Sequence, residues 1–417
     1  MGFTKERSAA VQQAIVAVFF IQGFVGTAII PRIPEIIRQI NVDFTAWGLI
    51  MGLAIAGGVL GLIFTNRVIY RYGTKKVVIV GGVGLTLILA SIGFITNPLI
   101  FFFVQVVNAF LFSIFNIASN SQTVALQKAL NKIIIGKFHA AWAIGAAGAS
   151  ALGGFFSTFM SLSVHFVLVA AIAAVFFVYY SQNLLSNDED GHGQGKPARK
   201  PVSFFKSPNQ VWLLAAGLFT GVMCELTMMD WSTLFSEEAL GLERGRSAIP
   251  LIAFSIAHII GRLLINPLSK KWHLSKIAQV SGISGSVSIL LGIVLGTPLS
   301  ATNETLALIT VSLFFALAGF GSAPLVPSYF SLAGSVKGLT TAQVLARMSL
   351  VNTSAIIVVK ILMGISADGF GVASVFTFAI VFMFACGVLA GIMAKRSKNK
   401  PHESAYPATG SLSIVSE

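Results

Sequence analysis

Four ionisable side chains inside the long apolar stretches of the chain, where a charge is costly, do not fit the pattern of charged loops. Glu225 and Asp230 share one stretch, His258 lies in the next one, and Lys360 lies in a later one. An ionised carboxylate in a hydrocarbon environment costs about 2.5 kcal/mol or more, so it faces a partner or a water-filled cavity. Burial also raises a carboxyl pKa toward the range in which protons are exchanged. These residues are the first candidates for chemistry.

The two carboxylates are predicted to face different neighbours. A spacing of five residues turns Glu225 and Asp230 about 140° apart around a helix. Glu225 lies deeper and has no evident partner in the sequence, so it is the first prediction for a proton-coupling group, with Asp230 as the second. Lys360 matches Asp230 in depth, and an ion pair that only braces the fold is the alternative role for both.

Neutral polar side chains form a second candidate site. At 100° per residue, one arc of about 80° on the fourth apolar stretch carries amides and hydroxyls. Gln22, in the first stretch, lies among small residues that allow close approach. These side chains suit hydrogen bonding to a polar, sugar-like solute, and they could equally join helices to one another. The predicted solute-binding residues are Gln22, Gln105, Asn108, Asn116, Ser119 and His258.

The elements that position these residues are membrane helices. The chain is 55% hydrophobic, and runs of about 20 apolar residues match a hydrocarbon core of about 30 Å. A lone helix satisfies its own backbone hydrogen bonds in lipid, whereas the alternating pattern of a membrane barrel is absent. The predicted spans are 13–30, 46–65, 76–95, 98–124, 138–158, 162–181, 210–235, 248–268, 275–297, 304–330, 345–366 and 371–394.

Most of the 28 Lys and Arg residues fall in every second gap between these spans. Short loops rich in Lys and Arg stay in the cytoplasm, so both termini are predicted to be cytoplasmic. This arrangement also accounts for the net charge of +13 without nucleic acid. Cys224 and Cys386 both lie in apolar spans, which argues against a disulfide framework or a thiolate metal site.

A hydrophilic stretch divides the chain into two predicted bundles. Residues 1–181 and 209–396 each hold six spans, 182–208 has the composition of a cytoplasmic linker, and 397–417 has that of a disordered cytoplasmic tail. Two six-helix halves with a solute site between them are a transporter plan. The predicted fold is all-α, with twelve transmembrane helices in two pseudo-symmetric bundles.

Several short motifs resemble the major facilitator superfamily. Its loop signature is matched by Arg71, Gly73 and Lys75, while Tyr70 and Asn66 depart from it, and Gly261-Arg262 fits a pattern in the eighth helix. The order of Arg32-Ile33-Pro34-Glu35, His139, Glu225 and Asp230-Trp231 further resembles the bacterial inner-membrane YbjJ-like branch. The resemblance implies that the first, fourth, seventh and tenth helices line a cavity.

The sequence thus predicts a secondary active transporter of a small polar solute, proton-coupled, monomeric and located in the inner membrane. Arg32 and Asp230 are predicted to form an outer gate, and Lys360, Arg71 and Arg262 are further candidates for gating or ion pairs. Two alternatives stay open: efflux of amphipathic compounds by proton antiport, and a non-transporting receptor or scaffold. No enzyme motif, phosphate loop or cofactor motif is present in the sequence, so energy is expected from gradients.

Overall fold

The structure is a computed structural model that describes the whole chain except residues 1–3, 131–133, 191–206, 334–335, 337–340 and 398–417. The described part is helical and contains no strand. Its elements are α1 (Lys5–Thr27), η1 (Ile30–Arg32), α2 (Ile33–Ile40), α3 (Phe44–Leu53), α4 (Ile55–Tyr72), α5 (Thr74–Ile92), α6 (Pro98–Leu130), α7 (Ile135–Phe156), α8 (Leu162–Ser181), α9 (Asn187–Asp190), α10 (Asn209–Glu238), α11 (Ile249–Ser269), α12 (Leu274–Ser300), α13 (Glu304–Ser322), α14 (Leu325–Ala333), α15 (Thr341–Phe370), η3 (Val372–Val375) and α16 (Phe376–Ser397).

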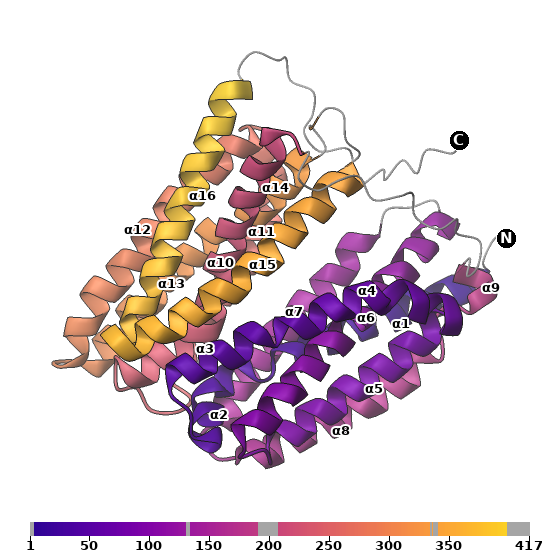
Figure 1. Cartoon of the computed structure of the whole chain (residues 1–417), viewed down its shortest axis with the longest axis horizontal. Coiled ribbons are helices and arrows are strands. Elements are labelled where there is room, and N and C mark those ends of the chain that lie inside the picture. The colour runs from indigo at the N-terminus through magenta and orange to yellow at the C-terminus, as the bar shows by residue number, and fades with distance from the viewer. Residues whose placement is uncertain (1–3, 131–133, 191–206, 334–335, 337–340, 398–417) are drawn as a thin grey trace. The chain divides into compact units, whose positions relative to one another are not determined.

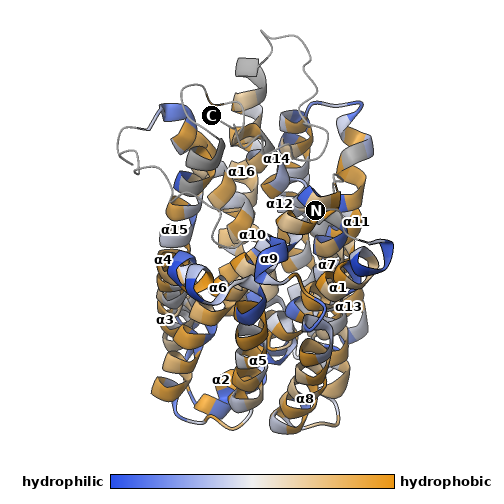
Figure 2. Ribbon diagram, turned by 90° about the vertical axis from the view of Figure 1, so that its right-hand side faces the viewer, coloured by the Kyte–Doolittle hydropathy of each residue, from blue (hydrophilic) through white to orange (hydrophobic). Residues whose placement is uncertain are grey.

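The predicted spans are confirmed as helices. Eleven helical segments of the described residues are long and apolar enough to cross a membrane. The remaining predicted span is α7, whose 22 residues cover about 33 Å. It is rich in Gly and Ala, which contribute less hydropathy than Leu, Ile or Phe. Figure 2 shows apolar residues along the bodies of the helices and hydrophilic ones mostly at their ends and in the connections.

The tenth predicted span, 304–330, is interrupted in the structure. α13 ends at Ser322, Pro324 lies in the gap, and α14 begins at Leu325. Proline donates no backbone hydrogen bond and clashes with the preceding turn, so it ends the helix there. A second interruption, at Ala54 between α3 and α4, involves no proline and could not be predicted from one.

The chain forms two compact units. Unit 1 comprises residues 1–200 with two short segments, 243–248 and 360–365, and unit 2 comprises 201–242, 249–359 and 366–417. The same pairs of helices pack in both: α4 on α6, α5 on α6 and α5 on α8 in unit 1, against α11 on α13, α12 on α13 and α12 on α16 in unit 2. This repetition is the pseudo-symmetry predicted from the sequence.

Close helix contacts depend on glycine. A Cβ atom on Gly145 of α7 would lie 2.0 Å from the carbonyl oxygen of Phe20 in α1, and one on Gly23 of α1 would lie 2.1 Å from that of Trp142. Only glycine permits the two backbones to approach this far. The small-residue ladder of the fifth span therefore holds α7 directly against α1, the helix that carries Gln22.

Candidate functional site

Glu225 lies at the centre of a charged cluster in unit 2, formed by α10, α11 and α13. Arg262 Nη2 donates to both carboxylate oxygens at 3.3 Å, and His258 Nε2 lies 3.6 Å from Glu225 Oε1. The Glu225 side chain is 20% exposed and that of Arg262 is 40% exposed. The expectation that Glu225 lacks a partner is therefore wrong. Arg262, predicted as a candidate for gating or an ion pair, lies inside α11, one turn from His258.

The hydrogen bonds of His258 define where protons can reside in this cluster. Ser322 Oγ donates to the carbonyl oxygen of Gly319 at 3.1 Å, so it accepts from His258 Nδ1 at 2.7 Å. With Nδ1 protonated, a neutral His258 presents a bare Nε2 to Glu225. Nε2 lies 3.6 Å from Glu225 Oε1, so the carboxyl and the imidazole face each other beside Arg262.

A neutral cluster occupies unit 1, where α1 meets α6. Gln22 Nε2 donates to Asn116 Oδ1 at 3.2 Å, and Asn120 Nδ2 donates to the same oxygen at 3.1 Å. The Oε1 of Gln22 and the Oγ of Ser119 are buried and accept no hydrogen bond from a described residue. The structure thus brings together three of the predicted solute-binding residues, and it adds Asn120, which the sequence stripe omitted.

Gln105 and Asn108 lie on the same helix at a different depth. Gln105 is buried and donates to Met51 Sδ at 3.6 Å, and Asn108 is half-buried. At 1.5 Å per residue, Gln105 lies about 16 Å along the helix from Asn116. One small solute cannot contact both residues at once, so the predicted stripe is divided between two depths.

Arg32 is completely buried in unit 1 and has partners on every side. Its guanidinium donates to both carboxylate oxygens of Glu35, at 2.5 and 2.8 Å, and to the carbonyl oxygen of Met160 at 3.0 Å. Its Nη1 lies 3.1 Å from His165 Nδ1, which accepts the hydrogen bond. Arg244, in the segment 243–248 of the same unit, lies 3.7 Å from Glu35 Oε2. The sequence predicted a gating role for Arg32 but did not indicate Glu35 and His165 as its partners.

Asp230 and Lys360 are both half-buried, in α10 and α15. Asp230 belongs to unit 2 and Lys360 falls in the segment 360–365 of unit 1. Their pairing with one another, and the outer gate of Arg32 with Asp230, stay predictions.

The signature loop after α4 is fastened by α9. Gly73 has a φ of +79°, and a Cβ atom there would collide with the side chain of Asn187 in α9. Thr74 donates a hydrogen bond to Asp190, and Gln122 of α6 donates to Thr74 Oγ1 at 2.7 Å. Arg71 lies with its guanidinium carbon 5.6 Å from the ring centroid of Tyr72.

Glu189 of α9 anchors the start of α1. Arg7 donates to its two carboxylate oxygens at 3.0 and 2.6 Å. The hydrogen bond from Arg7 lowers the pKa of Glu189 to about 2, with help from the backbone N–H of Ser186 and against the effect of burial. Residues 182–190 fall in the predicted linker, and their described structure is a turn after α8 followed by the short helix α9.

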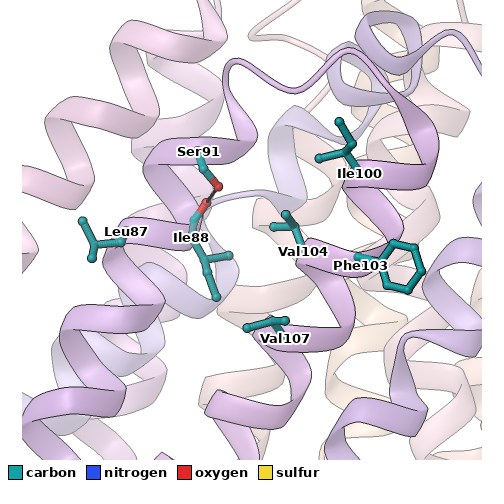
Figure 3. A pocket seen from close by; sticks show the side chains of 7 residues that line it. All are labelled: Leu87, Ile88, Ser91, Ile100, Phe103, Val104 and Val107. Atoms are coloured by element: carbon teal, nitrogen blue, oxygen red, sulfur yellow. Dashed lines mark hydrogen bonds between the residues drawn. The ribbon is translucent and has the colours of Figure 1, made fainter.

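The structure contains two hollows that differ in chemistry. A hollow of about 450 Å³ between α5 and α6 is lined by apolar side chains and Ser91, whose hydroxyl is already bonded to the Ile88 carbonyl oxygen at 2.7 Å (Figure 3). Leu87 and Phe103 at its rim are among the exposed apolar side chains of the helices. Such a surface suits lipid and offers a polar solute no binding group. The second hollow lies along α6 and is lined by both polar and apolar side chains.

Metal ligation finds no support among the described residues. They contain no group of three or more His, Cys, Asp and Glu side chains that could hold an ion.

Comparisons with known proteins agree on one family. The model of the Major Facilitator Superfamily matches residues 15–342. The uncharacterized transporter y4wD of Sinorhizobium fredii is 24% identical over 392 residues, which are 91% of this chain and 97% of the relative. An uncharacterized MFS-type transporter of Yersinia pestis is 24% identical over 374 residues, 87% of this chain and 89% of the relative.

Two solved structures are similar in fold. A mutant of the nucleoside transporter NupG gives a TM-score of 0.74 at 14% identity, with 93% of this chain and 100% of that chain covered. A bacterial homolog of the human lysosomal transporter Spinster, inward-facing and unoccupied, gives a TM-score of 0.68 at 13% identity, covering 94% and 96%.

Proposed function

The chain belongs to the major facilitator superfamily and is a multi-pass membrane transporter, and on that premise we propose that it carries a small polar solute, coupled to protons, by alternating access. We further propose an inner-membrane location with both termini in the cytoplasm, which the distribution of Lys and Arg supports. The proposal treats the protein as a monomer. We also propose that the chain belongs to the YbjJ-like branch of the superfamily.

The observation that supports proton coupling is the contact of Glu225 with His258, at 3.6 Å, and with Arg262, at 3.3 Å. In one state the carboxyl is protonated and donates to His258 Nε2. In the other state the carboxylate is ionised, and the adjacent Arg262 and a protonated imidazole stabilise it. Both states satisfy the same contacts, so a proton can be loaded and released without rebuilding the helices. Glu225 is the proposed coupling carboxyl, and Asp230 is a second candidate at a different depth.

The amide cluster of unit 1 supports the proposed solute chemistry. A buried acceptor without a donor costs about 1–3 kcal/mol, so Gln22 Oε1 and Ser119 Oγ favour a ligand that supplies O–H or N–H groups. Hydroxylated solutes such as sugars and nucleosides have this property. NupG, similar in fold, is a nucleoside transporter, and nucleosides therefore belong in a first set of test solutes. Gln105 and Asn108 would contact the solute at another stage of its passage, and His258 would contact it from unit 2.

We assign the remaining charged residues to gating. Asp230 would close the outer side together with Arg32, which would itself stay fixed by its pair with Glu35. Lys360 would pair with Asp230 in part of the cycle, and Arg71 would act at the signature loop. Arg262 would bind the ionised Glu225 carboxylate in one state and release it in the other.

The test is flux into proteoliposomes that contain the purified chain, using uridine, D-glucose and D-gluconate as radiolabelled probes. The proposal expects uptake of at least one probe, and faster uptake when a proton gradient is imposed. Flux that ignores the gradient would contradict the coupling. Proton-driven expulsion of an amphipathic cation such as ethidium, with none of the three probes transported, would favour efflux. Absence of all flux from correctly folded protein would favour a receptor or scaffold.

A further inference from the structure

We propose that α6 carries a second solute-binding station, in a hollow of about 360 Å³ with mixed polar and apolar lining that lies toward its C-terminal end. The hollow would take a small polyhydroxylated solute on its way to or from the cytoplasm, and this proposal rests on the transport function and orientation proposed above. Its polar lining consists of Asn120, Ser121 and Lys128 of α6 and Asp190 of α9.

The hollow continues a face of α6 that α4 contacts in the first half of the helix. There, Val106 and Phe110 lie on this face and their carbonyl oxygens approach Gly57 and Gly61 of α4 closely. Steps of three and four residues continue the same face through Ser113 and Ile117 to Ser121. From Ile117 onward this face lines the hollow. Ser121 is half-buried there, and Lys128 further along the helix is exposed.

Three of the lining side chains, those of Asn120, Ser121 and Lys128, can form further hydrogen bonds. Asn120 uses its amide N–H groups on the carbonyl oxygen and side chain of Asn116, and its own Oδ1 accepts nothing from a described residue. Ser121 donates to the Ile117 carbonyl oxygen at 2.9 Å, which leaves its oxygen free to accept. Lys128 is exposed and forms no ion pair within the described part of the chain. Two acceptors and one cationic donor are thus available to a ligand.

Asn120 connects this hollow to the amide cluster at α1. Asn120 lines the hollow and also donates to Asn116, which accepts from Gln22. Along the helix axis Ser121 lies only about 7 Å from Asn116, close to the length of one small solute. Small-molecule pockets begin at about 300 Å³, so the hollow admits a solute of monosaccharide or nucleoside size. A solute could pass from one station to the next without losing all its hydrogen bonds.

Cysteine labelling tests whether water and solute reach the hollow. The native Cys224 and Cys386 are fully buried, so the unmodified chain should show little labelling. In inverted membrane vesicles, Ser121→Cys should react with a membrane-impermeant methanethiosulfonate, which needs an aqueous path to the thiol. Val80→Cys, at an exposed apolar position of α5, is the matched control and should not react. An unreactive Ser121→Cys in folded protein would overturn the proposal.

Protection from labelling tests solute binding. Uridine, D-glucose or D-gluconate should slow the labelling of Ser121→Cys, and adding Asn120→Ala should weaken that protection about tenfold, as expected for one lost hydrogen bond. Lys128→Gln should weaken protection by gluconate alone, which separates a carboxylate-bearing solute from a neutral one. Labelling that none of the three probes slows would overturn the station. Proteoliposome flux is measured separately, so transport without protection rejects the station, and protection without transport rejects the proposed function.

Discussion

Two arginine–glutamate pairs lie in the membrane helices, and they differ in tightness and in access to water. Arg32 is 0% exposed, contacts Glu35 at 2.5 and 2.8 Å, and has two further partners. Arg262 is 40% exposed and contacts Glu225 at 3.3 Å through one nitrogen. Each pair has a histidine neighbour, His165 in the first and His258 in the second.

The comparison shows which intramembrane charges can change during a transport cycle. A fully buried pair is strongly destabilised when one partner is removed, because the other is left as an uncompensated charge. A pair that reaches water can exchange its partner for a proton or a water molecule at low cost. The Arg32 pair is thus suited to holding unit 1 together, and the Glu225 pair is suited to switching.

The largest expected effect is on stability. Arg32→Gln should lower the free energy of unfolding by about 3–5 kcal/mol, because Glu35, which is nearly buried, then keeps only the more distant and half-exposed Arg244 at 3.7 Å. Arg262→Gln should cost about 1 kcal/mol or less, because Glu225 remains within reach of water. Thermal unfolding of the purified variants in detergent measures both. Equal losses in the two variants would remove the distinction between the pairs.

Replacing His165 should destabilise the protein more than replacing His258, in the same order as the two arginines. His165→Phe leaves the Nη1 of the buried Arg32 without an acceptor, at a cost of about 1–3 kcal/mol. His258→Phe leaves Ser322 bonded to Gly319 and should cost less, while it slows proton-dependent uptake. Unfolding temperatures and initial uptake rates of both variants test this contrast. A His258→Phe protein that transports normally would remove His258 from the coupling cluster.

The sequence predicted the fold better than it predicted the partners. Helix length and apolar runs depend on local composition, which is why every predicted span is helical. The pairing of Glu225 with Arg262 and His258 depends on how α10 and α11 face each other, and residue spacing along one helix does not contain that information. One signal was available: Arg262 lies four residues after His258, on the same face of one helix.

The role of Asn120 was missed for a related reason. The amide stripe was chosen as the narrowest arc, and Asn120 falls outside it because it lies one residue beyond Ser119. Its hydrogen bond to Asn116 reaches back one turn, a contact that a helical wheel shows only if neighbouring turns are compared.

The smallest effect concerns a third pair, Arg7 with Glu189, outside the membrane spans. The pKa of Glu189 is lowered from 4.5 to about 2, so its carboxylate contributes stability above about pH 4.5 and loses it as the pH falls toward 2. Glu189→Gln should therefore lower the unfolding temperature slightly at neutral pH. The difference from the unmodified chain should shrink in acid. Unfolding scans of both proteins from pH 7 to acid measure it, and a difference that grows in acid would contradict the sign of the shift.

The measurement that tests the central claim most directly is solute accumulation by Glu225→Gln in proteoliposomes, with and without an imposed proton gradient. Glutamine keeps the shape of the side chain and an acceptor for Arg262, but it cannot exchange a proton. The account predicts that the gradient no longer drives accumulation while solute exchange continues, and that the matched Glu35→Gln variant keeps its gradient dependence even where less protein folds. Accumulation by Glu225→Gln that still follows the proton gradient would contradict the account.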